Sequence, residues 1–314
     1  MRDARAARAA RAGSHCCAEW FRSSGTSGKK ERPRARGQQR RAAGHDGRLG
    51  VANDGSSDPR FARGDRRAAE REMRARWFLR EGAALAPAFT SNQEETRMNI
   101  GIIGAGNIGG TLTRRLTALG HNVSVANSRG PESLSDLTAE TGAHAVTAQD
   151  AARHKDLVIV TIPERHVPDL PRDLFADADG TVVVDTGNYY PKRDGRIDAI
   201  ESGTPESAWV SQQLGRPVVK AFNNIYAQHL MDNGRPAEKT GRIALPVAGD
   251  NPADKQVVMN LVNDLGFDPV DAGTLADSWR QQPGTPVYAT DHDADGVRRA
   301  LAAASPERTK EFRA

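Results

Sequence analysis

"MNIGIIGAGNIGGTLTRRLTALGHNVSVANSRG", residues 98–130, contains a short apolar run, a glycine-rich turn, a helical pattern and a second apolar run. The apolar side chains of the helical part recur at helical spacing, at Ile108, Leu112, Leu116 and Leu119. Arg114 and Arg115 fall on the opposite side, so the predicted helix is amphipathic. Gly120 stands where such a helix ends. The stretch therefore predicts a strand, a tight turn, a helix and a second strand, in that order.

The rest of the chain continues this alternation of strands and helices. Predicted strands span residues 99–103, 122–126, 157–162, 181–185, 217–221, 242–248 and 267–270. Several are apolar throughout, as expected where helices cover both faces of a parallel sheet. We predict an α/β fold with a Rossmann-type, doubly wound, mostly parallel sheet over residues 98–273. A small loop and helix over residues 274–314 would complete the substrate side.

Residues 1–97 form a leader with a different composition. They hold 22 Lys and Arg against 12 Asp and Glu, whereas residues 98–314 hold 22 against 28. The overall basic pI near 9.2 therefore reflects the leader and gives no argument for a nucleic-acid partner. The leader is rich in Arg, Ala and Gly, so it buries too little apolar surface to offset the entropy of ordering. We predict that it is disordered, and we expect Met98 to be the native start after translated upstream sequence.

Cysteine content and hydropathy indicate the cellular setting. Both cysteines, Cys16 and Cys17, lie in the leader, and residues 98–314 contain none. This excludes disulfides, thiolate catalysis and cysteine-ligated zinc from the predicted domain. No apolar run approaches the length of a membrane span. We therefore expect a cytoplasmic protein with no metal site and no membrane or nucleic-acid partner.

The glycine-rich turn predicts the ligand. Gly104, Gly106 and Gly109 form a G-x-G-x-x-G pattern directly after a strand and at the start of a helix. The first glycine permits a tight turn, the second lets the backbone approach a pyrophosphate, and the third lets the helix pack close to the sheet. The helix N-terminus adds free N–H groups and a positive dipole. This context favours a dinucleotide.

The end of the second strand indicates which dinucleotide is bound. An NAD site usually has an acidic residue here for the ribose hydroxyls, but this chain has Asn127 followed by Ser128 and Arg129. A carboxylate would repel a 2′-phosphate, whereas a hydroxyl beside a guanidinium can hydrogen-bond and neutralise it. We therefore predict NADP as the cofactor.

The ligand of a doubly wound sheet lies across the carboxyl ends of the strands. Three predicted strand ends therefore supply candidate cofactor contacts, namely Thr161, Ile162 and Pro163, then Asn188, then Asn223. The two asparagines can hydrogen-bond the nicotinamide amide or a substrate, although asparagine is also common in turns.

Taken together, these segments resemble the deazaflavin-dependent NADP reductases, which exchange hydride between NADP and coenzyme F-420. The likeness spans Met98 to about Gly273 and includes "NSRGPESL", "VVVDTGNYYP", "PVVKAFNNI" and "LPVAGDNPADKQVVMNLVNDLGFDPVDAG". It implies that Gly104, Gly106, Asn107 and Ile108 cradle the pyrophosphate, and that Ser128 and Arg129 bind the 2′-phosphate. It also implies direct hydride transfer, with a deazaflavin as co-substrate, and a homodimer.

The chain departs from this family on the substrate side. Asn223 stands where a histidine is expected, so it is only a weak candidate for a catalytic residue. No side chain is otherwise predicted to act as acid or base, and His229 is interpreted as non-catalytic. The segment with Trp279, Arg280 and Tyr288 replaces the family's helical tail, and it is compatible with a different pocket or with simple packing.

Two other functions fit the same residues. An imine or β-hydroxyacid reductase has a similar glycine turn, and Lys220 would then correspond to a catalytic lysine, but those enzymes carry a long helical C-terminal domain. A non-catalytic NADP-sensing module is the second alternative, since a fold does not determine a function.

Overall fold

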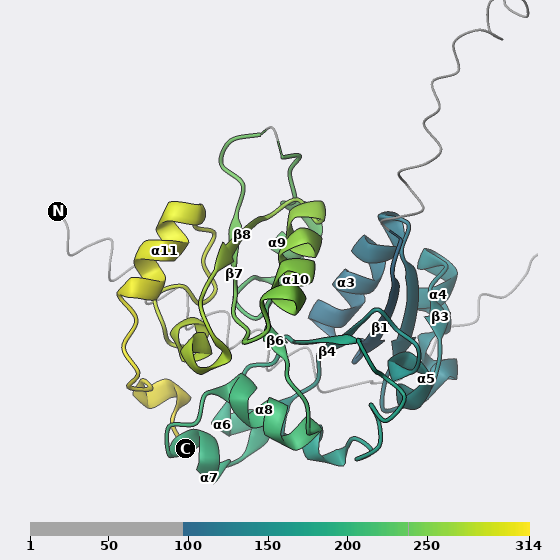
Figure 1. Cartoon of the computed structure of the whole chain (residues 1–314), viewed down its shortest axis with the longest axis horizontal. Coiled ribbons are helices and arrows are strands. Elements are labelled where there is room, and N and C mark those ends of the chain that lie inside the picture. The colour runs from purple at the N-terminus through teal and green to yellow at the C-terminus, as the bar shows by residue number, and fades with distance from the viewer. Residues whose placement is uncertain (1–96, 238) are drawn as a thin grey trace, which may run out of the picture. The chain divides into compact units, whose positions relative to one another are not determined.

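The computed structural model describes residues 97–237 and 239–314, so the predicted leader, except for Arg97, lies outside the described residues. The strands are β1 (Asn99–Ile103), β2 (Asn122–Ala126), β3 (His144–Ala145), β4 (Leu157–Val160), β5 (Val182–Asp185), β6 (Val219–Lys220), β7 (Ala244–Val247) and β8 (Asp268–Asp271). Within this part of the chain, six strands pair in parallel in the order β3-β2-β1-β4-β5-β6 (Figure 1). This confirms the predicted doubly wound parallel sheet. The strand order reverses between β1 and β4, which is where such sheets bind ligands.

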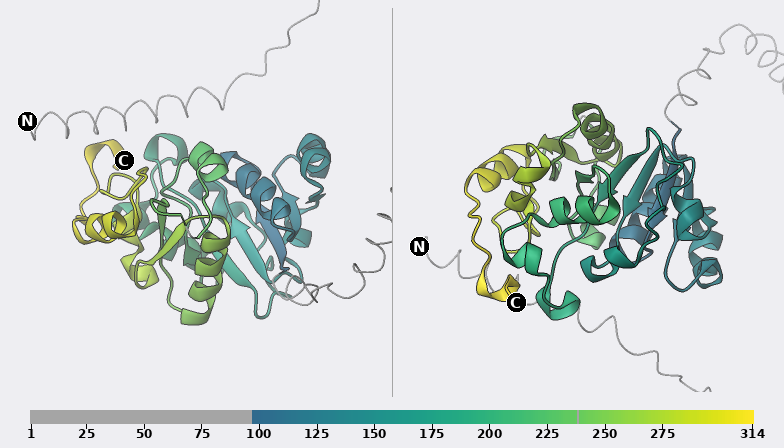
Figure 2. Two further views of the ribbon diagram at one scale, coloured as in Figure 1. Left: turned by 90° about the horizontal axis from the view of Figure 1, so that it is seen from above. Right: turned by 60° about the horizontal axis from the view of Figure 1, so that its bottom comes forward.

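Helices lie on both sides of the strands (Figure 2). The α-helices are α3 (Asn107–Ala118), α4 (Ser135–Thr141), α5 (Ala148–Ala152), α6 (Pro191–Asp194), α7 (Asp198–Glu201), α8 (Glu206–Leu214), α9 (Ala227–Asp232), α10 (Pro252–Asp264) and α11 (Ala294–Ala302). The 3-10 helices are η1 (Pro131–Leu134), η2 (Glu164–Asp169), η3 (Leu275–Gln281) and η4 (Lys310–Phe312). Helices α3, α9 and α10 contribute to the core on one face of the sheet, and α5 contributes to the core on the other.

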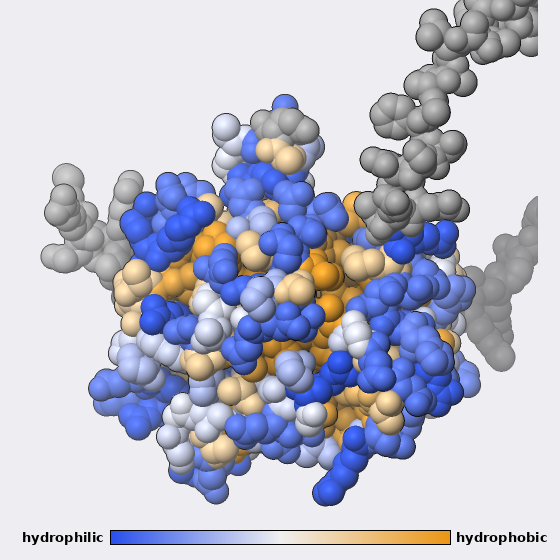
Figure 3. All heavy atoms as spheres, in the orientation of Figure 1, coloured by the Kyte–Doolittle hydropathy of each residue, from blue (hydrophilic) through white to orange (hydrophobic). Residues whose placement is uncertain are grey.

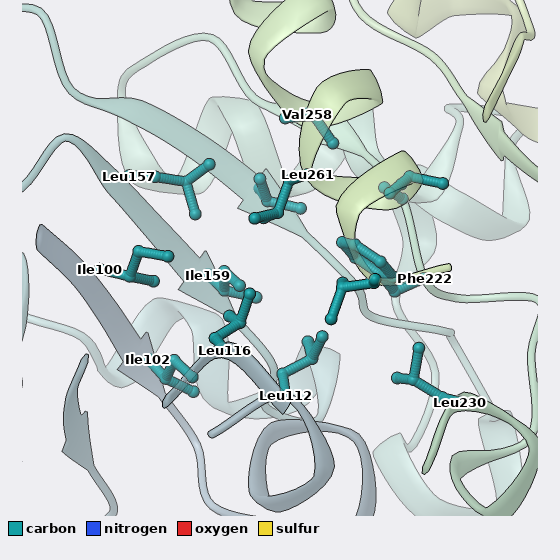
Figure 4. Packing of buried hydrophobic residues seen from close by; sticks show 14 of the residues in the cluster. Ile100, Ile102, Leu112, Leu116, Leu157, Ile159, Phe222, Leu230, Val258 and Leu261 are labelled. Carbon is teal, nitrogen blue, oxygen red and sulfur yellow. The ribbon is translucent and has the colours of Figure 1, made fainter. Parts of the chain in front are cut away.

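The core follows the two-residue period of the strands. On β1, Ile100 and Ile102 belong to the cluster that includes α3, whereas Ile103 belongs to the cluster that includes α5. Leu112 and Leu116 of α3 are fully buried in the first cluster (Figure 4). A Cβ at Gly101 would lie 1.7 Å from the carbonyl oxygen of Ala151, so the missing side chain is what lets α5 pack against the strand.

Three features differ from the expected pattern. Strand β3 was not predicted, because a strand of two residues is too short to show a periodic pattern. Strands β7 and β8 form a separate parallel pair, which meets the main sheet through one antiparallel bridge between Lys220 and Ala248. Leu119 is 44% exposed because it follows the last residue of α3 and leaves the apolar face.

The two arginines of α3, which the amphipathic pattern places away from the apolar face, hydrogen-bond other helices. The guanidinium of Arg114 donates two hydrogen bonds to Glu140 on α4. Arg115 donates to the carbonyl oxygens of Met231 and Leu265, at the ends of α9 and α10. These carbonyls carry the negative end of a helix dipole, so the contact is favourable.

Polar side chains cover most of the face drawn in Figure 3, and hydrophobic colour gathers near α3 and α10. Within residues 97–237 and 239–314, no helix combines the length and apolar character that a membrane crossing requires.

Candidate functional site

The glycine turn between β1 and α3 has the geometry of a phosphate cradle. Gly104 has a φ of +113°, and its N–H donates to the carbonyl oxygen of Ala126 at 2.8 Å. A Cβ at Gly109 would lie 1.9 Å from the carbonyl oxygen of Gly104, whereas a Cβ at Gly106 would meet nothing within 4 Å. The first and third glycines are therefore required by packing, and the space beside the second is open to a ligand.

The start of α3 faces this space. Gly106 is the N-cap, and both Gly106 and Asn107 are exposed, with Ile108 half-buried after them. The first turn of the helix contains no acidic residue, so its amide groups and positive dipole are available to an anion. These features fit the pyrophosphate of a dinucleotide.

The end of β2 presents the residues predicted to bind a 2′-phosphate. Ser128 and Arg129 are exposed, and neither side chain forms a hydrogen bond or ion pair within the described part of the chain. The Asn127 side chain turns into its own loop, where its Oδ1 accepts the N–H of Arg129 at 2.9 Å. No carboxylate therefore occupies the position that holds the ribose in an NAD site.

The residues that follow β4, predicted to contact the cofactor, lie next to the glycine turn. Thr161, Ile162 and Pro163 follow β4 and are half-buried, and the N–H of Thr161 donates to the carbonyl oxygen of Ile103 at 2.9 Å. A Cβ at Gly104 would lie 2.3 Å from the carbonyl oxygen of Thr161. The turn after β4 thus packs directly against the glycine turn.

Asn188 and Asn223 are close together and bond to each other. Asn188 Nδ2 donates to the Asn223 carbonyl oxygen at 2.8 Å, and Asn223 Nδ2 donates to Asn188 Oδ1 at 3.0 Å. Gln281 of η3 joins them, since its carbonyl accepts from Asn223 Nδ2 at 2.7 Å and its Nε2 donates to Asn223 Oδ1 at 3.0 Å. Asn223 is only 4% exposed, so Asn188 is the better placed of the two for a ligand. Nothing in the local sequence indicated Gln281, which lies 58 residues from Asn223.

A buried ion pair lies beneath these loops. Lys220 has no exposed surface, and its Nζ donates to Asp185 Oδ2 at 3.0 Å and to the Gly187 carbonyl oxygen at 2.6 Å. Asp185 also accepts the Ser207 hydroxyl at 2.6 Å and the Gly187 N–H at 2.8 Å. The ammonium group thus joins the ends of β5 and β6, and Asn188 and Asn223 lie in the segments that follow these two strands. This geometry suits a structural charge better than a catalytic lysine.

Two further carboxyl groups are buried next to this pair. Glu164 Oε2 accepts from Arg193 at 2.7 Å, and Glu206 Oε1 accepts from Arg308 at 2.9 Å. Burial raises the pKa of Glu164 well above its ordinary value, and the nearby charge of Glu206 raises it further, against the opposing effect of Arg193. Burial also raises the pKa of Glu206, which Lys220 and Arg308 oppose. Both glutamates follow a proline and resemble ordinary surface residues in the sequence.

The backbone after β6 is strained. Phe222 has a φ of +60° and no exposed surface. Asn224, two residues later, is 1% exposed. Neither its side-chain Oδ1 nor its Nδ2 forms a hydrogen bond within the described residues. Strained backbone and unpaired buried amides concentrate at functional sites, because folding alone does not favour them.

The remaining candidates lie apart from the cradle or are already paired. His229 of α9 contacts Asp291 through Nδ1 at 2.9 Å and the ring of Tyr226 edge-on. The Arg280 guanidinium stacks over the Trp279 ring, 5.3 Å from its centre. The hydroxyl of Tyr288 hydrogen-bonds the hydroxyl of Tyr190.

The parallel sheet, its reversal point and the open glycine cradle define a dinucleotide-binding protein of the Rossmann type. Comparisons with known proteins agree. Residues 99–189 match the family model described as "NADP oxidoreductase coenzyme F420-dependent". The hypothetical protein SMa0349 from Sinorhizobium meliloti, a crystal structure, is 34% identical with a TM-score of 0.54, and the match covers 63% of this chain and 96% of that one.

Two curated relatives match shorter parts of their own length. The Escherichia coli protein YjhV is 55% identical over 73 residues, which are 23% of this chain and 53% of YjhV. The rat metalloreductase STEAP3 is 28% identical over 177 residues, which are 56% of this chain and 34% of STEAP3. The chain therefore spans about half or a third of the length of these relatives.

The chain belongs to the same family as the Sinorhizobium meliloti protein, and its residues 99–189 match a family model of NADP oxidoreductases. The family agrees with the predicted fold and with the predicted class of cofactor.

Proposed function

We propose that this protein is an NADP(H)-dependent oxidoreductase that transfers hydride directly to or from a second redox cofactor or a small substrate. The observation that carries the proposal is the glycine turn, where space is open only at Gly106. The exposed Ser128 and Arg129 side chains support NADP over NAD, because they follow β2 where an NAD site has a carboxylate.

The nicotinamide supplies the hydride when the cofactor is bound, so the protein needs to bind, orient and exclude water. Gly106, Asn107 and Ile108 would hold the pyrophosphate with backbone amides, and Thr161 to Pro163 would line the nicotinamide side. Asn188 offers an amide at the same edge, held in place by Asn223. This division of roles explains why no converging acid and base pair is needed in the cradle.

The second reactant is proposed to be a small redox molecule, with a deazaflavin such as coenzyme F-420 as the first candidate. The description of the matching family model and the resemblance of residues 98–273 support that choice. The metalloreductase relative adds ferric ion as an acceptor to test. Asn223 stands where the resemblance implies a histidine, so it is one of the two departures from the deazaflavin enzymes, with the segment that contains Trp279 and Tyr288. A cytoplasmic location and a homodimer, without a membrane or nucleic-acid partner, complete the proposal.

Binding and turnover test the proposal separately. Titration of the full chain should show tighter binding of NADPH than of NADH. Loss of NADPH absorbance should follow addition of a deazaflavin, a flavin or a ferric chelate. If NADH binds at least as tightly, the assignment of Ser128 and Arg129 is wrong. If NADPH binds but no acceptor consumes it, the sensing module replaces the enzyme.

A further inference from the structure

The loop of residues 127–133, between β2 and α4, has an internal hydrogen-bond chain that no cofactor contact requires. Asn127 Nδ2 donates to Ser133 Oγ at 2.8 Å, and the Ser133 hydroxyl donates to the Gly130 carbonyl oxygen at 2.8 Å. The N–H of Arg129 donates to Asn127 Oδ1 at 2.9 Å. One asparagine therefore closes both ends of a loop whose tip is Ser128 and Arg129.

The backbone of this loop needs such support. Gly130 has a φ of +90°, which reverses the chain before Pro131 begins η1. The three hydrogen bonds are exposed to solvent; two join a side chain to the backbone, and the third joins the side chains of Asn127 and Ser133. One such bond contributes only about 1 kcal/mol, so the order of the loop depends on all three. A disordered loop would have to lose backbone freedom when it binds a ligand, which weakens affinity.

Charge in the loop gives a second reason for its design. Asn127 occupies the position of the acidic residue in an NAD site. Its Oδ1 accepts the Arg129 N–H as a carboxylate oxygen could, but it carries no negative charge. Glu132 is an acid of the same loop, and a Cβ at Gly130 would lie 3.1 Å from its Oε2. No ion pair joins Glu132 to Arg129 among the described residues.

We infer that Asn127 and Ser133 are specificity-determining positioning residues, which hold Arg129 and Ser128 ready for a 2′-phosphate without contacting it. This inference rests on the proposed NADP function. It predicts that the loop contributes to NADPH binding and leaves NADH binding unaffected, because NADH has no 2′-phosphate to recognise.

Binding of NADPH, NADH and adenosine 2′-phosphate to the full chain tests the inference. Ser133→Ala removes the middle of the hydrogen-bond chain without a change of charge, and it should weaken NADPH and adenosine 2′-phosphate about fivefold, the scale of one net hydrogen bond. NADH affinity should stay within about twofold of the wild type. Ser135→Ala is the matched control, since Ser135 is also exposed and its hydroxyl forms no hydrogen bond among the described residues. It should leave all three affinities unchanged.

Asn127→Asp separates charge from geometry. A carboxylate can still accept from the Arg129 N–H, and the one proton of the Ser133 hydroxyl can go either to this carboxylate or to the Gly130 carbonyl oxygen. The bond between Arg129 and residue 127 is therefore kept while the charge of the loop becomes negative. NADPH should weaken by about tenfold or more, the scale of a lost charge-assisted contact, with NADH equal or tighter. Hydrogen exchange at the Arg129 amide should quicken in Ser133→Ala and stay slow in Asn127→Asp.

The outcomes separate the two levels of the proposal. A wild-type chain that binds NADH as tightly as NADPH overturns both the NADP assignment and the role of the loop. A clear NADPH preference that is the same in Ser133→Ala and Ser135→Ala overturns only the role of the loop. An equal loss of NADH and NADPH affinity in Ser133→Ala also overturns it, because the loop would then support the fold rather than specificity.

Discussion

Replacing Lys220 by methionine tests whether the buried ammonium is a structural charge. The substitution gives an unbranched side chain one atom shorter and removes the hydrogen bonds to Asp185 and Gly187. Because Asp185 would stay buried with its charge, the free energy of unfolding should fall. Removing one partner of a buried ion pair typically destabilises by about 3–5 kcal/mol.

The lower end of this range is expected here. Asp185 retains the Ser207 hydroxyl at 2.6 Å and the Gly187 N–H at 2.8 Å, and both donors stabilise the remaining carboxylate. A loss of ~3 kcal/mol corresponds to a fall in Tm of about 6–12 °C for a domain of this size. Urea unfolding followed by circular dichroism would give the free energy, and a thermal scan would give the shift in Tm.

The double variant Asp185→Asn with Lys220→Met is the matched control. It removes both charges, so it should be more stable than Lys220→Met alone and should give a coupling energy of about 1–3 kcal/mol in a double-mutant cycle. A single variant within ~0.5 kcal/mol of the wild type would refute the reasoning. Unchanged stability combined with lost hydride transfer would instead support the catalytic lysine of the β-hydroxyacid alternative.

Three other predictions concern the glycine turn, a buried acid and a helix cap. Gly109→Ala should destabilise the fold and abolish NADPH binding, since its Cβ would lie 1.9 Å from a backbone oxygen of Gly104. Gly106→Ala, whose Cβ meets nothing within 4 Å, should weaken NADPH binding and leave Tm unchanged. Binding titrations and thermal scans test this, and a larger fall in Tm for Gly106→Ala than for Gly109→Ala would contradict it. The raised pKa of Glu164 means that the folded protein holds a proton more tightly than the unfolded chain, so this group's contribution to stability is lost as pH rises from about 4.5 through the folded pKa. Glu164→Gln should flatten the fall of unfolding free energy with pH in that window, and a pH profile parallel to the wild type would contradict the assignment. Asn251 Oδ1 accepts the N–H of Ala253 at 2.9 Å as the cap of α10, so Asn251→Ala should lower the unfolding free energy by ~1 kcal/mol in urea titrations, and no change would show that water replaces the cap.

The sequence predicted the parts of this protein that depend on neighbouring residues. Strand β1, the glycine turn and α3 form from one continuous stretch, and each leaves a periodic or compositional signal of its own. The exposed Ser128 and Arg129 could be located for the same reason, because they directly follow β2. Strand β3 escaped because two residues are too few to show a period.

Only the tertiary structure decided which distant groups meet. Gln281 bonds Asn223 across 58 residues, and Arg308 reaches Glu206 across 102 residues. No local pattern encodes such partners, because they depend on how the ends of β5 and β6 lie against η3 and the C-terminal segment. The raised pKa of Glu164 likewise follows from its burial beside Glu206. The sequence alone thus determined the glycine turn and the elements beside it, whereas folding determined the charges and amides that meet at the ends of β5 and β6.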